Sequence, residues 1–381
     1  MEFYKNYLVF TSDYKKKFHF LSIENVKDNW TFDIDWSFVL NPKKPKMFLE
    51  SNNEEIENKA DLEAEKESEE IINNFTLSEN KELLAFTSSD KSLFLCKIDN
   101  DKTVTILSRR VFMRASSILR FSCCGKYLFL ADKTGDTFVY SCDDEGDEYL
   151  SSGKWIFGHI SQILDLQIAP DFSCIVTSDR DEKIRVTNYP DTHEIEAFCL
   201  GHKEFVSSLT FLKKDNIMMS ASGDKTLRTW DYRKGKELQK IEFPFVPITI
   251  YSSSIREGFG LIAMSSDDNK IYIYEYKFES SEYINLSCIG ENLYPNEFDF
   301  NIHDNKVFVK YLKNEHLQID IFDMDNKLFQ PFCNVSETFK DDVEGKIFKP
   351  FDVSLLFKKK YDNVKPFINR KRARIESQIR K

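Results

Sequence analysis

Residues 220–231 read S-A-S-G-D-K-T-L-R-T-W-D, a tight turn followed by an apolar strand that ends in Trp-Asp. Residues 177–186 read T-S-D-R-D-E-K-I-R-V and align with the first ten of these residues at an offset of 43. A Gly-His pair precedes each stretch, at Gly158–His159 and at Gly201–His202, again 43 residues apart. The chain therefore contains an internal repeat, and the period of that repeat indicates its fold.

The same turn recurs along the chain, at Asp13, Asp90, Asp136, Asp181, Asp224, Asp268 and Asn314. From Asp90 onward the spacing is 43–46 residues, which is typical of WD40 repeats. Each unit contains short stretches of alternating apolar residues, such as K-Y-L-F-L-A at 126–131, which predict strands. We expect an all-β, seven-bladed WD40 β-propeller over residues 1–357.

Ring closure needs a separate prediction. Few residues precede Asp13, which suggests room for one strand and not two. The segment F-D-V-S-L-L-F at 351–357 alternates like a strand and follows the last repeat. We expect it to complete the N-terminal blade and so seal the ring.

The net charge of −10 is strongly segregated. Residues 51–72 hold nine acids and two lysines, and residues 358–381 hold ten bases and two acids. The acidic segment cannot bury enough apolar area to offset its ordering entropy, so we expect a disordered insert between blades. The basic C-terminal tail is the natural place for contact with RNA.

Several classes of protein are disfavoured by the sequence. It contains no basic-then-apolar N-terminal segment and no apolar run of about 18 residues, so we expect a soluble protein that is neither secreted nor membrane-bound. Its eight cysteines form no C-x-x-C pair, which predicts reduced thiols and no metal site. It has no glycine-rich phosphate loop, G-x-S-x-G or H-E-x-x-H motif, so we expect no enzymatic activity and no cofactor.

Four residues are expected to form the hydrogen-bonded tetrad that locks a WD40 blade: His202, Ser220, Asp224 and Trp230. Zinc binding or general-base catalysis by His159 or His202 is the alternative. The structural interpretation is favoured because the repeat already requires these residues.

The charged stretch at 179–185 needs its own explanation. In the sister repeat the positions of Arg180, Glu182 and Lys183 hold ordinary turn residues. One interpretation is a solvated blade edge with weak local ion pairs. The other is a docking face, on which alternate charges set the register of a partner and reject wrong partners.

The chain resembles the WD-repeat, non-catalytic subunit of the eukaryotic tRNA (guanine-N(7)-)-methyltransferase complex. The resemblance is dense over residues 126–240. It rests on A-D-K-T-G-D (131–136), G-H-I-S-Q-I-L-D-L (158–166), T-S-D-R-D-E-K-I-R-V (177–186), F-C-L-G-H-K-E-F-V-S-S-L (198–209) and S-G-D-K-T-L-R-T-W-D-Y-R-K-G-K-E-L (222–238).

This resemblance implies that the chain is a non-catalytic subunit. A catalytic methyltransferase subunit, which binds S-adenosylmethionine and forms 7-methylguanine in the tRNA variable loop, would dock as a heterodimer on the side of the propeller. The residues implied are Glu182, Lys183 and Arg185, with Ile184 as an anchor and Arg185 pointing outward. Arg180 and Asp181 would organise the turn.

The resemblance and the basic tail together imply a nuclear protein. Arg370, Lys371, Arg372 and Arg374 suit tRNA phosphates and a nuclear import receptor equally well. The rival function is a general WD40 adaptor, such as a peptide reader or a ubiquitin-ligase substrate receptor. Such adaptors use the narrow top face of the propeller, whereas the distinctive charges here cluster in one blade.

Overall fold

The structure of the chain is a computed structural model. The described residues are 1–11, 17–36, 70–80, 82–112, 114–142, 153–212, 217–256, 259–277, 282–289, 298–313, 316–323, 325–326, 328–339 and 353–358. The chain divides into two units, residues 1–351 and 352–381. The first unit carries every strand found in the described residues.

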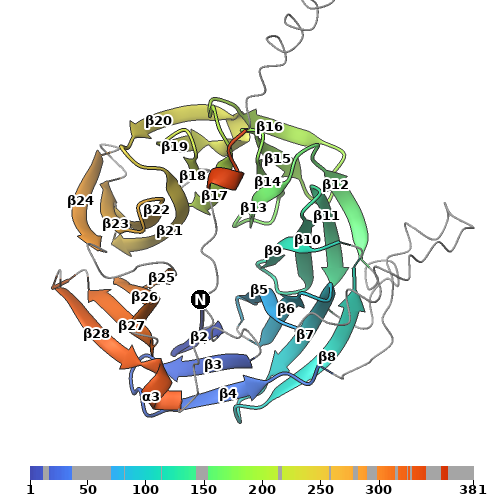
Figure 1. The fold of residues 1–381 in the computed structure, drawn as a ribbon. Helices are drawn as coiled ribbons and strands as arrows, with labels where there is room; N and C mark the ends of the chain where they lie inside the picture. Colours follow the sequence, from blue (N-terminus) through green and yellow to red (C-terminus); the bar gives the residue numbers. More distant parts are fainter. Residues whose placement is uncertain are drawn as a thin grey trace, which may run out of the picture. The chain divides into compact units, whose positions relative to one another are not determined.

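Seven four-stranded antiparallel sheets, numbered as blades 1–7 in chain order, form a ring (Figure 1). Blades 1 and 2 contain β1 (Glu2–Tyr4), β2 (Tyr7–Thr11), β3 (Lys17–Ser22), β4 (Asn29–Asp33), β5 (Ile72–Leu77), β6 (Leu83–Ser88), β7 (Ser92–Ile98) and β8 (Val104–Val111). Blades 3 and 4 contain β9 (Ser116–Phe121), β10 (Tyr127–Asp132), β11 (Asp136–Ser141), β12 (Lys154–Gly158), β13 (Ile163–Ile168), β14 (Cys174–Asp179), β15 (Ile184–Asn188) and β16 (Ile195–Cys199).

The remaining three blades follow the same pattern. They contain β17 (Val206–Phe211), β18 (Ile217–Ser222), β19 (Thr226–Asp231), β20 (Lys236–Glu242), β21 (Pro247–Arg256), β22 (Phe259–Ser266), β23 (Ile271–Lys277), β24 (Glu282–Ile289), β25 (Phe298–His303), β26 (Lys306–Lys313), β27 (His316–Asp323) and β28 (Leu328–Asn334). Short helices are η2 (Tyr232–Lys234), α3 (Val335–Phe339) and η3 (Val353–Leu355). The predicted seven-bladed propeller is confirmed.

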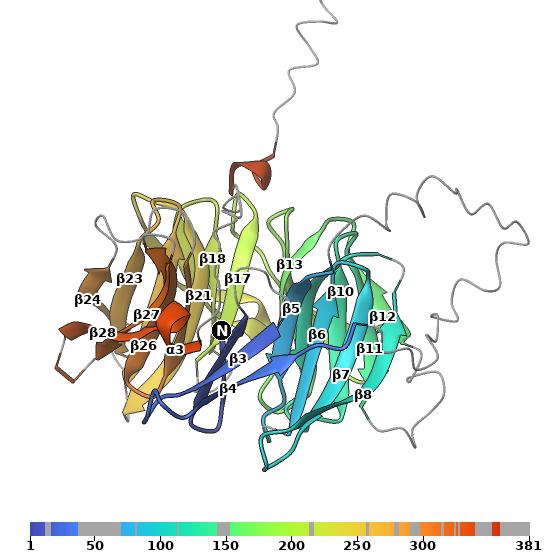
Figure 2. The same ribbon diagram turned by 60° about the horizontal axis from the view of Figure 1, so that its bottom comes forward.

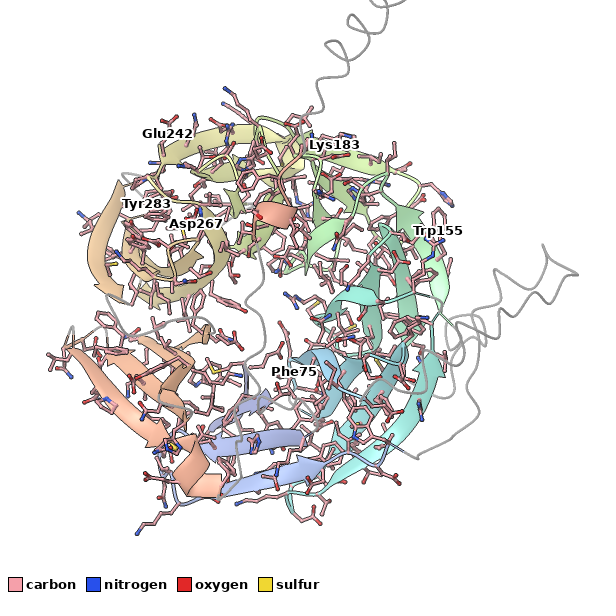
Figure 3. All side chains as sticks on the ribbon, viewed as in Figure 1. Phe75, Trp155, Lys183, Glu242, Asp267 and Tyr283 are labelled. Atoms are coloured by element: carbon pink, nitrogen blue, oxygen red, sulfur yellow. The ribbon has the colours of Figure 1, made fainter. Side chains whose placement is uncertain are left out.

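The core lies between the blades. Each pair of neighbouring blades shares one cluster of buried apolar side chains, because alternate residues of a strand face opposite neighbours. The first strand of every blade lines a central channel of about 570 Å³, and Phe75 on β5 is one of the lining residues (Figure 3). The fourth strand of each blade is the outermost (Figure 2).

The predicted ring closure is wrong. Blade 1 is built entirely from the N-terminal segment, since β1 needs only three residues and joins β2 through a tight turn in which Lys5 has φ 50°. Residues 353–355 form the 3-10 helix η3 and not a strand. Blade 1 instead packs side chains on blade 7: the ring of Phe3 stacks on His303 at 4.4 Å, and the Asn301 amide donates to the carbonyl of Met1 at 2.8 Å.

Some sequence predictions lie outside the described residues. These are the turns at Asp13 and Asn314, most of the acidic insert, and the tail residues Arg370, Lys371, Arg372 and Arg374. The expected end of the insert at residue 72 needs correction, because Ile72 is buried and begins β5. No helix in the described part of the chain is long and apolar enough to cross a membrane.

Candidate partner-docking face

The tetrad predicted for blade 5 is present. Both ring nitrogens of His202 are hydrogen-bonded: its Nε2 lies 2.7 Å from Ser220 Oγ and its Nδ1 lies 3.1 Å from Asp224 Oδ2. The indole Nε1 of Trp230 donates to the same Ser220 oxygen at 2.8 Å, and Trp230 is fully buried. Within the described residues no group of three or more His, Cys, Asp or Glu side chains is arranged to hold a metal ion. The tetrad ties together β18, β19, the turn between them and the loop that precedes β17.

Protonation of this tetrad is shaped by burial. Burial lowers the pKa of His202, and the hydrogen bond to Asp224 only partly opposes that effect. Burial alone would raise the pKa of Asp224, but hydrogen bonds from His202 and Thr226 hold it well below its ordinary value. His202 is therefore neutral and Asp224 ionised in the folded protein at pH 7.

Blade 4 uses a shifted version of this network. His159 contacts Thr177 Oγ1 at 2.8 Å and Asp179 Oδ2 at 3.1 Å. Asp179 Oδ1 also accepts hydrogen bonds from the backbone N–H groups of Asp181 and Lys183, each at 2.9 Å. Asp179 thus helps to organise the turn in which Arg180 and Asp181 lie.

The turn between β14 and β15 presents two of the predicted docking residues. Glu182 has φ 67°, and Lys225 at the equivalent place in blade 5 has φ 65°, so both turns use the same left-handed position. Lys183 is exposed and lies at the outer rim of the ring, one blade away from Trp155 (Figure 3). Both side chains are therefore carried on a turn fixed by Asp179.

Ile184 and Arg185 point to opposite faces of blade 4, as predicted. Ile184 is fully buried in the cluster shared with blade 5. The Arg185 guanidinium lies 4.9 Å from the ring centroid of Phe157 on blade 3, and its Nη1 donates to the carbonyl of Gly158 at 3.3 Å. Arg185 is therefore half-buried between two blades, and less outward than expected.

The sister residue in blade 5 is Arg228, which has carboxylate partners within the propeller. Its Nη1 contacts Glu237, and its Nη2 lies 3.6 Å from Asp224. Arg185 has no carboxylate within salt-bridge distance among the described residues, and its Nε is buried without a hydrogen-bond partner there. Burial accordingly lowers the pKa of Arg185. A half-buried cation lacking a counter-ion is costly for a folded chain to keep, and an incoming carboxylate would offset that cost.

Apolar side chains beside Arg185 were not predicted from the sequence. Phe198 on β16 is the cross-strand neighbour of Arg185, and the two side chains share one face of the blade. Phe198 is 41% exposed and Leu200 is 64% exposed. Their only sequence signal was the apolar alternation of I-E-A-F-C-L at 195–200, which also fits a buried strand. We define the docking face as Glu182, Lys183, Arg185, Phe198 and Leu200.

These features define a class of protein: a seven-bladed propeller of the WD40 class, with the hydrogen-bonded tetrad of that class in blade 5. A model of the WD40 domain of the tRNA methyltransferase protein TRM82 matches residues 39–148 and 142–257.

Curated relatives carry the name tRNA (guanine-N(7)-)-methyltransferase non-catalytic subunit wuho. That of Aedes aegypti is 35% identical over 98% of this chain and 96% of its own. That of Culex quinquefasciatus is 37% identical over 79% of this chain and 75% of its own. That of Drosophila melanogaster is 34% identical over 81% of this chain and 75% of its own. The chain belongs to this family of non-catalytic tRNA (guanine-N(7)-)-methyltransferase subunits.

Proposed function

We propose that this chain binds the catalytic methyltransferase subunit at the docking face and holds it in its active arrangement. The observation that carries the proposal is the contrast between Arg185 and Arg228. The same strand position is neutralised inside blade 5, whereas in blade 4 none of the described residues places a carboxylate within salt-bridge distance of it. A carboxylate supplied by the catalytic subunit would complete this site.

The apolar part of the docking face suits a stable heterodimer. Phe198 and Leu200 would be removed from water on binding, while Arg185 and Lys183 would set orientation and reject wrong partners. Binding would act through preorganisation, since holding mobile segments of an enzyme in the reactive geometry raises its rate without adding a chemical group. S-adenosylmethionine would be bound by the partner alone.

The basic tail supports a further part of the proposal. Arg370, Lys371, Arg372 and Arg374 would contact tRNA phosphates in the complex or an import receptor that brings the protein to the nucleus. A general adaptor function is less well supported, because the side chains of the docking face belong to one blade and are not among those that line the central channel.

Co-expression with the catalytic subunit, followed by size-exclusion chromatography, tests the proposal. A single stoichiometric complex is expected, and Phe198→Asp should abolish it because a carboxylate would be buried in the interface. Leu328→Asp is the matched control, since Leu328 is 62% exposed on the outer strand of blade 7. If both variants lose the complex to the same extent, or if neither loses it, the partner does not bind at the docking face.

A further inference from the structure

The outermost strand of blade 4 is supported from the neighbouring blade. β16 carries Phe198 and, among the described residues, pairs with β15 alone. Its other edge is therefore free of strand pairing, and such an edge moves easily unless something holds it. In the described structure the turn of blade 5 formed by η2 and Gly235 packs against this strand.

Arg233 makes the polar part of that contact. Its Nη1 lies 3.2 Å from both carboxylate oxygens of Glu196 on β16. Its Nη2 donates to Asp171 Oδ2 at 2.6 Å and also contacts Ser173 Oγ. Asp171 and Ser173 lie in the turn between β13 and β14, so one guanidinium joins blade 5 to two elements of blade 4. The side chain is only 25% exposed, which favours a fixed geometry over a solvated ion pair.

The backbone beside Arg233 approaches β16 just as closely. Gly235 has φ 62°, and a Cβ at this position would meet the carbonyl oxygen of Phe198 at 2.4 Å. Tyr232 is buried in the same cluster as Cys199, the last residue of β16. The turn therefore contacts β16 at Glu196, Phe198 and Cys199, along most of its length.

We propose that Arg233 is a positioning residue for the docking face, acting through Glu196 and β16 without touching the partner. The inference rests on the proposed function of that face. Fixing β16 before binding would remove an ordering cost that the complex would otherwise bear. Phe198 would then be presented beside Arg185 in the geometry that the partner needs.

The test measures the affinity of the full chain for the purified catalytic subunit and the exchange of β16 amide hydrogens in the free protein. Arg233→Met should weaken binding about tenfold, mainly through a faster off-rate, and speed exchange in β16. Arg233→Lys should restore part of the affinity, because it keeps the charge and loses the bidentate geometry. The losses of affinity caused by Arg233→Met and by Glu196→Gln should not add in the double variant, since both substitutions break the same contact between Arg233 and Glu196.

Two further variants make the outcomes distinguishable. Arg109→Met is the matched control, because Arg109 pairs with Asp90 in blade 2, away from blade 4, and should change neither binding nor β16 exchange. Arg185→Glu reports on the docking face itself. If Arg185→Glu weakens binding and Arg233→Met leaves both measurements unchanged, the positioning inference is overturned and the docking face stands. If neither variant weakens binding, the docking face itself fails.

Discussion

The guanidinium of Arg185 on blade 4 lies over the ring of Phe157 on blade 3, 4.9 Å from its centroid. The aromatic face supplies some of the electrostatic stabilisation that a carboxylate gives Arg228 in the next blade. It also holds the guanidinium at the junction of two blades, so its direction is set before any partner arrives. This relationship makes Arg185 a packing residue, and the partner recognition proposed for it would be a second role.

Reversing this charge should separate the two contributions. Arg185→Glu places a like charge against a partner carboxylate, and losses of ~2–5 kcal/mol, roughly a thousandfold in affinity at the upper end, are expected. Arg185→Lys should weaken binding less, because the positive charge remains. Calorimetric binding to the catalytic subunit and circular dichroism should be recorded on the same preparations. A folded Arg185→Glu variant with wild-type affinity would sink the docking assignment, and a misfolded one would indicate a packing residue only.

The tetrad of blade 5 should be a major source of stability. Trp230→Phe removes the indole N–H that donates to Ser220 and leaves unfilled volume, and about 1–3 kcal/mol of stability should be lost. Urea unfolding measures the change. Trp155→Phe is the control, since Trp155 also donates to a side chain, Asp136, but is half-buried at the rim. If both variants lose the same stability, burial of the tetrad is not what matters.

Stability should fall as the pH is lowered below neutrality. The pKa of His202 is lowered in the folded protein, mainly by burial. Below its ordinary value of about 6.5 the unfolded chain therefore binds a proton that the folded chain excludes, and unfolding becomes easier. The urea midpoint, measured from pH 7.5 to 5.5, should decrease, and His202→Gln should decrease less over the same range. Identical slopes for the two proteins would contradict this assignment.

The acidic insert should be dispensable for folding and for docking. Because Ile72 belongs to β5, the deletion should cover residues 51–69 only. The removed segment is strongly acidic and adds little apolar area to any core, so the cooperative melt and the heterodimer should both persist. Thermal unfolding and size-exclusion chromatography check this. A broadened or lost transition in the deletion variant would mean that the insert packs on a blade.

The basic tail should act through charge. Removing residues 358–381 takes away ten bases and should weaken tRNA binding by the complex in a salt-dependent way, or exclude the protein from the nucleus. Each lost phosphate contact should reduce the slope of log affinity against log salt by about one. The heterodimer should remain intact. Unchanged tRNA affinity at low salt together with unchanged localisation would leave the tail with neither proposed task.

The sequence by itself determined the propeller, because a turn that recurs every 43–46 residues between short strands is the pattern of WD40 blades. It also determined the tetrad, since His202, Ser220, Asp224 and Trp230 occupy fixed places in that repeat. These features depend on local order and spacing, which can be read from one chain.

Other features were decided only by the tertiary structure, because they depend on which surfaces of different blades meet. The ring closes by packing of Phe3 on His303 and not by the predicted strand at 351–357. The contrast between Arg185 and Arg228 depends on where the carboxylates of a blade come to lie, and their sequence surroundings are alike. Phe198 is 41% exposed although the turn of blade 5 packs against the backbone of β16, and alternation within a strand cannot say which side is covered.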